Sequence, residues 1–444
     1  MPDPLHDFAV ELYEEHLEEA GILYEQRIVL ARDAHFPWQD LGDLENRFTT
    51  HFNALMMGGQ AADQVFEAID EEAEPGECYT LAARLCRRQE WPQILHLLDE
   101  TDWQAPTGRA VMDALVHACP DDWVDNITAH ARDHPHCRAP AASLTGHRRV
   151  QSAAAELISW GQEATLLPQI IWSLGRVGDR SGMPWLLALN PPEEHLALER
   201  AIALQRLGEQ EFMQGEPWNP NRPGWWILAK SLAGRRDDGV VLLAQPDSIW
   251  EKPEAILALG LLGYRDGIDQ LFEFLQDSDK AAIAALALEL ITGAGLNEEV
   301  FVPETLEEDE LFEAERKTLE QGGSLVDQEG EPYGHWATRR CEDAGIWSAW
   351  WSEQQHNFAR ENRWRGGLPF SPFALVGQLA HPNLPNTIRD WIHQELVIHF
   401  GAKTHFEWTL PVVNQLKELE ALKSWALAAG GQDSATITPA REKP

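Results

Sequence analysis

Hydrophobic residues recur at helical spacing along the first sixty positions. Acidic residues fill the remaining side of the first segment, and the pattern stops at Pro37. A second run follows from about Asp40, and Gly58 and Gly59 form a helix-ending signal after it. This pattern predicts two amphipathic helices, whose apolar positions are Leu5, Phe8, Leu12, Tyr13, Leu17 and Leu23 in the first and Leu41, Leu44, Phe48, Phe52 and Leu55 in the second.

A repeated motif occupies the middle of the chain. Residues 170–178 align with residues 255–263, and each copy ends in Leu-Gly followed by a second glycine three positions on. The glycines that end the copies step by 30, 26, 29 and 30 residues: Gly178, Gly208, Gly234, Gly263 and Gly293. This period is typical of stacked helices in an α-solenoid. Each glycine is predicted to end a helix in the left-handed conformation.

No alternating strand pattern of useful length accompanies these helices, so the predicted fold is all-α. Five segments are expected. They are an acidic helical region (1–76), a repeat solenoid (77–300), an acidic insert or linker (301–335), a Trp-rich helical module (336–428) and a disordered tail (429–444). The insert is expected to be an acidic helix followed by a loop, or a linker.

The chain is strongly acidic, with 35 Lys and Arg against 72 Asp and Glu and a formal charge of −37. Such a surface repels phosphate backbones and anionic lipids, so nucleic acid and membranes are not expected partners, whereas a basic protein is. Residues 1–100 carry −16 and residues 301–350 carry −9. Two acidic patches are therefore candidate partner-binding sites, although a merely solubilising surface is an equal alternative: Glu11, Glu15, Glu18 and Glu19, and Glu307, Glu308, Asp309 and Glu310.

The chain lacks a run of roughly 20 apolar residues and begins without a secretory signal, so a cytoplasmic protein is expected. Five cysteines, odd in number and sparse, make a disulfide framework improbable.

Three groups of residues invite a chemical interpretation. The densest comprises His117, Cys119, His130, His134, His136 and Cys137, but its spacing matches no known zinc finger, and Pro135 breaks the helix after the His130/His134 pair. His393 and His399 lie six residues apart, on opposed helix faces, unlike a zincin pair. Arg363 and Arg365 flank Trp364, and we interpret them as an internal ion pair or a loop cap. No catalytic residue, metal site or cofactor is predicted.

Two resemblances follow from these motifs. The A-L-G-x-L-G phrase resembles the short HEAT-like repeat of phycobilisome lyases and implies a fold without implying lyase activity. The chain also resembles a family of proteobacterial HEAT-repeat proteins often encoded near type VI secretion genes, to which no activity is assigned. The matching positions are residues 16–20, Leu23, Arg27, Val29, Asp40, Leu41, Leu44, Arg47, residues 51–55, Trp350, Asn362, Arg363, Arg365, Gly366 and Pro369.

The expected function is therefore that of a non-catalytic scaffold that binds a basic protein, since solenoids hold proteins on an extended concave face. The secretion context implies an immunity protein that occludes a toxin, or alternatively an adaptor that loads a secretion effector. A metal protein or enzyme that uses the His/Cys group near 117–137 would also agree with the residues, as would a structural subunit of a larger assembly.

Overall fold

The computed structural model describes residues 4–70, 72–303, 316–317 and 333–430, and most of these residues are helical. The predicted all-α class is thereby confirmed, apart from two small sheets. No helix in the described part of the chain is both long and apolar enough to cross a membrane.

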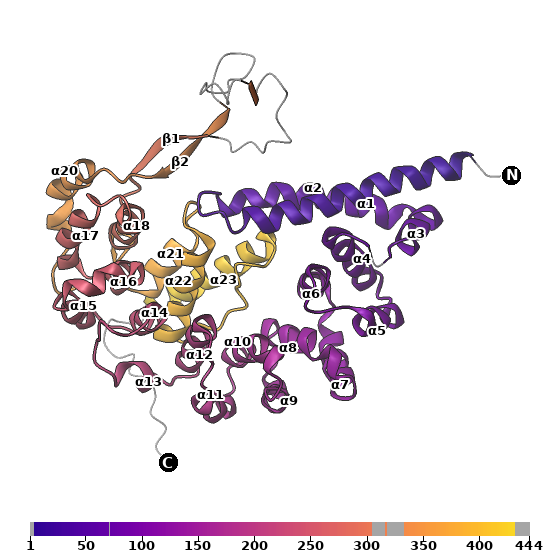
Figure 1. Cartoon of the computed structure of the whole chain (residues 1–444), viewed down its shortest axis with the longest axis horizontal. Helices are drawn as coiled ribbons and strands as arrows, with labels where there is room; N and C mark the ends of the chain where they lie inside the picture. The colour runs from indigo at the N-terminus through magenta and orange to yellow at the C-terminus, as the bar shows by residue number, and fades with distance from the viewer. Residues whose placement is uncertain (1–3, 71, 304–315, 318–332, 431–444) are drawn as a thin grey trace.

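Eight helices, here called the inner helices, pack each against the next and follow an arc (Figure 1). Their apolar residues form two hydrophobic clusters that both include residues of α12, and α16 and α18 are buried on nearly every side. The inner helices are α4 (Pro75–Arg88), α6 (Pro106–Ala118), α8 (Arg138–His147), α10 (Leu167–Val177), α12 (Glu194–Arg206), α14 (Gly224–Leu232), α16 (Pro253–Leu262) and α18 (Ala281–Thr292).

Shorter helices alternate with the inner ones along the chain and lie on the outside of the arc (Figure 1). Each of them contacts a neighbouring inner helix. The outer helices are α5 (Trp91–Glu100), α7 (Val124–Asp133), α9 (Ala154–Trp160), α11 (Met183–Ala188), α13 (Glu211–Gln214), α15 (Arg236–Leu243) and α17 (Ile268–Phe274).

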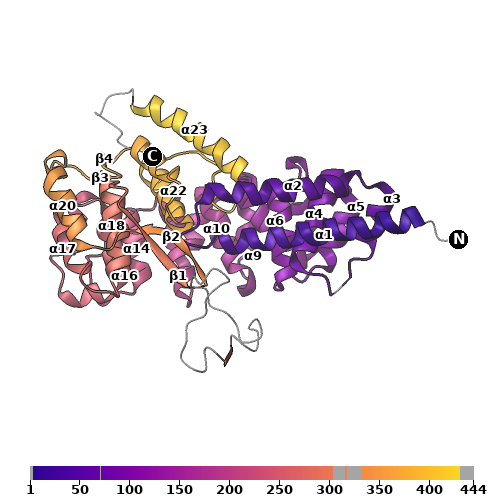
Figure 2. The same cartoon turned by 90° about the horizontal axis from the view of Figure 1, so that it is seen from above.

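The N-terminal hairpin, formed by α1 (Pro4–Leu30) and α2 (Leu41–Met57), spans the open side of the arc (Figures 1 and 2). It is followed by α3 (Gly59–Glu67), a short helix that the sequence pattern did not predict. One end of the hairpin packs on α4. At the other end, Trp38 donates a hydrogen bond to the carbonyl of His381 (3.1 Å), and Asn386 donates one to the carbonyl of Ala31 (2.8 Å). The hairpin therefore joins the N-terminal end of the arc to the C-terminal part of the chain.

Of the C-terminal helices, α21 and α22 lie inside the arc rather than extending it (Figure 1), and α23 lies along one side of it (Figure 2). Of these, α22 contacts both α12 and α14, and α23 contacts α2. Before them, α20 packs on α17 and buries Trp347 and Trp351 in the core. The elements are α20 (Ala344–Gln354), β3 (Trp364–Arg365), β4 (Leu368–Pro369), α21 (Pro372–Leu379), α22 (Asn386–Phe400) and α23 (Val412–Gly430).

Four of the five ladder glycines adopt the predicted left-handed conformation at helix ends: Gly178, Gly208, Gly263 and Gly293. The prediction is wrong for Gly234, which does not have a positive φ angle. A side chain is excluded there for another reason, because a Cβ atom at Gly234 would lie 2.4 Å from the Leu262 side chain. Close packing of α14 on α16 therefore selects this glycine.

The expected acidic helix or linker at 301–335 is partly wrong. Strand β1 (Asn297–Pro303) pairs antiparallel with β2 (Gly334–Arg340), from Asn297 opposite Arg340 to Pro303 opposite Gly334. Arg339 forms an ion pair with Glu298 (2.9 Å) across the two strands. The sheet formed by β1 and β2 projects away from the helices (Figure 1). Residues 304–315 and 318–332, and the predicted tail from 431 onward, lie outside the described residues.

Replacement of Leu259 by Asp is expected to lower the free energy of unfolding by more than about 4 kcal/mol, because Leu259 is 0% exposed in the last turns of α16 and the carboxylate would be unpaired. Thermal or urea denaturation measures this change. The control Val240→Asp, at a position 46% exposed on α15, should change stability by less than about 0.5 kcal/mol. Equal effects of the two substitutions would contradict the position of Leu259 in the core.

Candidate functional site

Residues 363–367, here called the capping segment, run across the C-terminal ends of three inner helices. The Arg363 guanidinium donates to the carbonyls of Gly234 (2.9 Å) and Leu261 (2.8 Å). Arg365 donates to the carbonyls of Gly260 (2.7 Å) and Leu261 (2.6 Å). The amides of residues 366 and 367 donate to carbonyls in the last turn of α18. The capping segment thus satisfies carbonyls that helix ends leave without partners.

The two arginines share one buried carboxylate, that of Glu395 on α22. Arg365 binds both oxygens of Glu395 (2.5 and 2.6 Å), and Arg363 binds one (2.5 Å). Arg365 and Glu395 are both 0% exposed, and burial lowers the pKa of Arg363 to about 9. The interpretation of this motif as an internal ion pair is therefore confirmed, and these arginines are not available for nucleic acid.

A second buried carboxylate, that of Glu407, lies in the segment between α22 and α23. Its ion pairs connect this segment to the inner helices in the middle of the arc. The carboxylate accepts hydrogen bonds from Arg149 (2.6 Å) and Arg176 (3.0 Å), and Arg176 also pairs with Glu199 (2.8 Å). Burial opposes ionisation of Glu407, but the two guanidinium groups overcome it and hold the pKa of this carboxyl well below its usual range. The C-terminal helices therefore occupy the inner side of the arc, where a partner protein was expected to bind.

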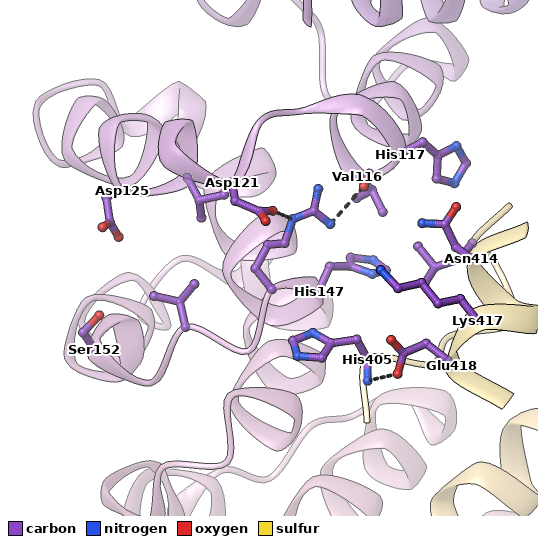
Figure 3. Close-up of a pocket in the computed structure, with 14 residues that line it drawn as sticks. Val116, His117, Asp121, Asp125, His147, Ser152, His405, Asn414, Lys417 and Glu418 are labelled. Atoms are coloured by element: carbon purple, nitrogen blue, oxygen red, sulfur yellow. Dashed lines mark hydrogen bonds and ion pairs between the residues drawn. The ribbon is translucent and has the colours of Figure 1, made fainter. Parts of the chain in front are cut away.

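A hollow of about 640 Å³ remains between the inner helices α6 and α8 and the C-terminal helix α23 (Figure 3). His405 and Lys417 lie on its C-terminal side and His147 comes from α8, whereas Asp125 and Ser152 lie across it (Figure 3). The polar groups serve the fold: Arg148 pairs with Asp121 (2.9 Å) and donates to the carbonyl of Val116 (3.1 Å), while Glu418 accepts from the amide of His405 (2.9 Å). This arrangement holds two parts of the chain together and brings Ser152 to none of the histidines.

The first predicted acidic patch lies on an exposed helix face. Glu11, Glu15, Glu18 and Glu19 are all exposed on α1, on the side opposite Leu17, Ala20 and Tyr24, which face the core. We call this surface the outer face of α1; it also carries three apolar side chains, Phe8 (63% exposed), Ile22 (44%) and Val29 (68%). The sequence pattern placed Leu5, Phe8 and Leu12 on the apolar side of the first helix, but all three are exposed (79%, 63% and 39%), so the buried stripe of α1 is formed only by its later positions. The second predicted patch, Glu307, Glu308, Asp309 and Glu310, lies outside the described residues.

The His/Cys group predicted near 117–137 is not one site. His117 hydrogen-bonds with the hydroxyl of Tyr79 (3.0 Å) and the carbonyl of Thr409 (3.2 Å), and the Cys119 thiol contacts that of Cys86. His136 binds the carbonyl of Thr101 (2.6 Å). Only His130, His134 and Cys137 remain together.

These three residues share a neighbour that sequence analysis missed. Asp99 lies 2.9 Å from the Nε2 atom of His130 and 3.3 Å from the sulfur of Cys137. Burial and Asp99 raise the pKa of the Cys137 thiol to about 12.

The two histidines of α22 are core residues. His399 bonds to the carbonyl of Leu232 (2.7 Å) at the end of α14. His393 is 0% exposed and packs edge-on against Phe406, and neither of its ring nitrogens has a hydrogen-bond partner among the described residues. They share no site, in agreement with the prediction that they are not a zincin pair.

No protein-family model matches this chain, and no curated protein or solved structure shows significant similarity to it. The resemblance to HEAT-repeat proteins of secretion loci thus stays a prediction.

Because several histidines are buried, we expect the free energy of unfolding to decrease in mild acid. Burial lowers the pKa of His147 and of His399 to about 3 and that of His117 and His393 well below the ordinary 6.5. Below pH 6.5 the unfolded chain therefore takes up protons that the folded chain does not, so stability falls as pH falls toward 3. Asp390 opposes this in part, because burial raises its pKa to about 6 and the folded chain binds that proton first.

Between pH 6.5 and 5, each buried histidine should contribute to the decrease in the free energy of unfolding with a slope that rises from about 0.7 to about 1.4 kcal/mol per pH unit. Replacement of His393 by Leu should make the decrease shallower by about one such contribution, because it removes a ring with no hydrogen bonds to lose. Urea denaturation across this pH range measures both slopes, and His35→Leu, at an exposed position, is the control. A His393→Leu slope equal to that of the wild type would show that His393 titrates freely.

Proposed function

We propose that this protein is a non-catalytic scaffold that binds a basic protein along the outer face of α1. The observation that carries the proposal is the coexistence of exposed Phe8, Ile22 and Val29 with four exposed glutamates on one face of the hairpin. Apolar side chains rimmed by charge are typical of docking surfaces. The C-terminal helices cover the inner side of the arc, so a partner would bind on an outer surface such as this face.

The matching partner surface would be amphipathic, with apolar side chains that cover Phe8 and Ile22 and with Lys or Arg around them. The charge of −16 on residues 1–100 would attract such a surface before contact, and the apolar residues would hold it afterwards. Complementary charge raises association rates more than it raises affinity, whereas buried aromatic anchors slow dissociation.

We further propose that the arc is an α-solenoid of HEAT-like repeats, as the sequence resemblance implies. Support comes from the consecutive packing of the inner helices and from left-handed glycines at four ladder positions. In the context of type VI secretion, a rigid acidic scaffold fits an immunity protein that neutralises a basic toxin by occluding it.

An effector adaptor is the second candidate, since the hairpin is a single exposed element that a client could bind without covering the arc. The two roles differ in a cell-based experiment. Growth rescue of cells that express an isolated toxin domain supports immunity, whereas loss of effector export without rescue supports an adaptor.

Reversing Glu15, Glu18 and Glu19 to Lys should lower the rate of association with the partner captured by affinity purification, by about 10-fold or more at low salt, because the steering charge is removed. The fold should persist, since all three positions are exposed. Stopped-flow kinetics across a salt series measures the rate, which for the wild type should fall as salt rises while dissociation changes little.

The matched control reverses three exposed acids elsewhere, Asp247, Glu353 and Glu361, and changes the net charge by the same six units. It should retain a near wild-type association rate. If both triple variants slow association equally, only the net charge matters and the outer face of α1 is not the docking surface. A salt-independent rate for the wild type would also contradict the proposal.

A further inference from the structure

Three side chains of different ligand types converge between two neighbouring outer helices. Asp99 lies near the end of α5, His130 in the last turn of α7, and Cys137 at the end of the short 3-10 helix Pro135–Cys137. Their donor atoms, a carboxylate oxygen, an imidazole nitrogen and a thiol sulfur, all lie within 4.8 Å of one another. They come from three separate elements, so their convergence results from the tertiary fold.

The separations fit one small metal ion. Ligand atoms on a tetrahedral zinc ion lie roughly 3.3–3.8 Å apart, given metal–ligand bonds of about 2.0–2.3 Å. Here the oxygen–nitrogen distance is 2.9 Å and the oxygen–sulfur distance is 3.3 Å, each of them a hydrogen bond to the Asp99 carboxylate. An ion between the three atoms would replace those hydrogen bonds with a modest expansion.

The residues around these three ligand atoms leave room for a fourth ligand from solvent. Cys137 is 0% exposed and His130 mostly buried, whereas the Asp99 side chain is 39% exposed. The ring of His134 stacks on that of His130, with 3.8 Å between centroids, and its Nδ1 atom bonds to the carbonyl of His130 (3.0 Å). His134 therefore fixes the orientation of His130, while solvent reaches the Asp99 side.

We propose that Asp99, His130 and Cys137 bind a divalent transition metal of the zinc class, with a water molecule as the fourth ligand. Thiolate, imidazole and carboxylate are the donors that zinc takes in proteins, and calcium or magnesium would require oxygen donors throughout. The site retains two residues of the His/Cys group and adds Asp99. It is independent of the outer face of α1.

The protons balance without any further reactant. The thiol of Cys137 releases one proton to solvent as the sulfur–metal bond forms. His130 stays neutral, because its proton moves from Nε2 to Nδ1 when Nε2 binds the metal. The Asp99 carboxylate exchanges two accepted hydrogen bonds for one metal bond.

Among the described residues, one other group of possible ligands, Asp390, His393 and Glu407, does not compete for the metal. Arg149 and Arg176 already donate to Glu407, so a cation there would lie against two buried guanidinium groups.

Titration of the metal-free full chain with Co²⁺ tests the proposal, because a bound thiolate gives a sulfur-to-cobalt charge-transfer band that carboxylates and histidines on the acidic surface cannot give. We expect one such site per chain, displaced by one equivalent of Zn²⁺. Cys137→Ser should abolish the band. His130→Gln and Asp99→Asn should weaken binding by about 100-fold or more, at least as much as loss of an outer-shell partner.

Cys341→Ser is the matched control, since Cys341 is also buried but lies far from Asp99 in the chain, and this variant should keep the band. Circular dichroism establishes that each variant is folded. Because His130→Gln and Asp99→Asn change partly exposed side chains, they remain informative if Cys137→Ser misfolds. Absence of the band in the wild type, or its persistence in folded His130→Gln and Asp99→Asn at wild-type affinity, would overturn the proposal.

Discussion

The arrangement of the C-terminal half depends on how the exposed carbonyls at the ends of the inner helices are satisfied. Helix ends leave carbonyl groups without partners, and here the ends of α14, α16 and α18 are covered by protein rather than by solvent. Arg363 and Arg365 donate to these carbonyls, and Glu395 pairs with both cations as their shared counterion. Removing Glu395 would leave two buried charges without a counterion, which is far more costly than the loss of a surface ion pair.

This constraint explains the glycines beside it. At Gly263 a Cβ atom would lie 2.1 Å from the carbonyl oxygen of Trp364, and at Gly293 it would lie 2.6 Å from the backbone of Gly366. Both positions also have left-handed backbone, with φ of +60° and +58°. Glycine therefore serves two purposes here, because it ends the helix and lets the capping segment approach closely.

With its inner side occupied, the molecule presents the N-terminal hairpin as an accessible acidic element of its described part. The hairpin is itself anchored, since Arg27 pairs with Glu45 (2.7 Å) and donates to the carbonyls of Thr409 and Leu410. A partner that binds the outer face of α1 would therefore meet a pre-organised helix and incur little ordering cost.

Sequence reasoning predicted the parts of the fold that are local. The glycine ladder and the amphipathic helices could be predicted because each depends on residues a few positions apart. The ion pair of Arg363 and Arg365 was inferred because cations in an acidic chain are expected to pair with its own carboxylates. The strands β1 and β2 were missed, since their facing residues lie far apart in the sequence without a short turn between them. Leu5, Phe8 and Leu12 fit the apolar side of the first helix but are exposed, because helical spacing shows a stripe without showing whether another element covers it.

The sequence revealed only part of the site formed by Asp99, His130 and Cys137. His130 and Cys137 stand out in the sequence, but Asp99 is one among 72 acidic residues. Its separation of 31 residues from His130 is close to the ladder period, so an extension of the repeat toward the N-terminus would have placed the two on adjacent outer helices. The position of the C-terminal helices inside the arc could not be predicted, because long-range packing decides it.

Native-state hydrogen exchange of wild type and Arg365→Met tests the central claim most directly. Breaking a buried ion pair costs about 3–5 kcal/mol, so amides in α21, α22 and the last turns of α16 and α18 should exchange faster by about two to four orders of magnitude. Amides in α4 and α6, at the other end of the arc, should be unaffected. Unchanged exchange in α22, or equal acceleration throughout the chain, would contradict the account that the capping segment holds the C-terminal helices inside the arc.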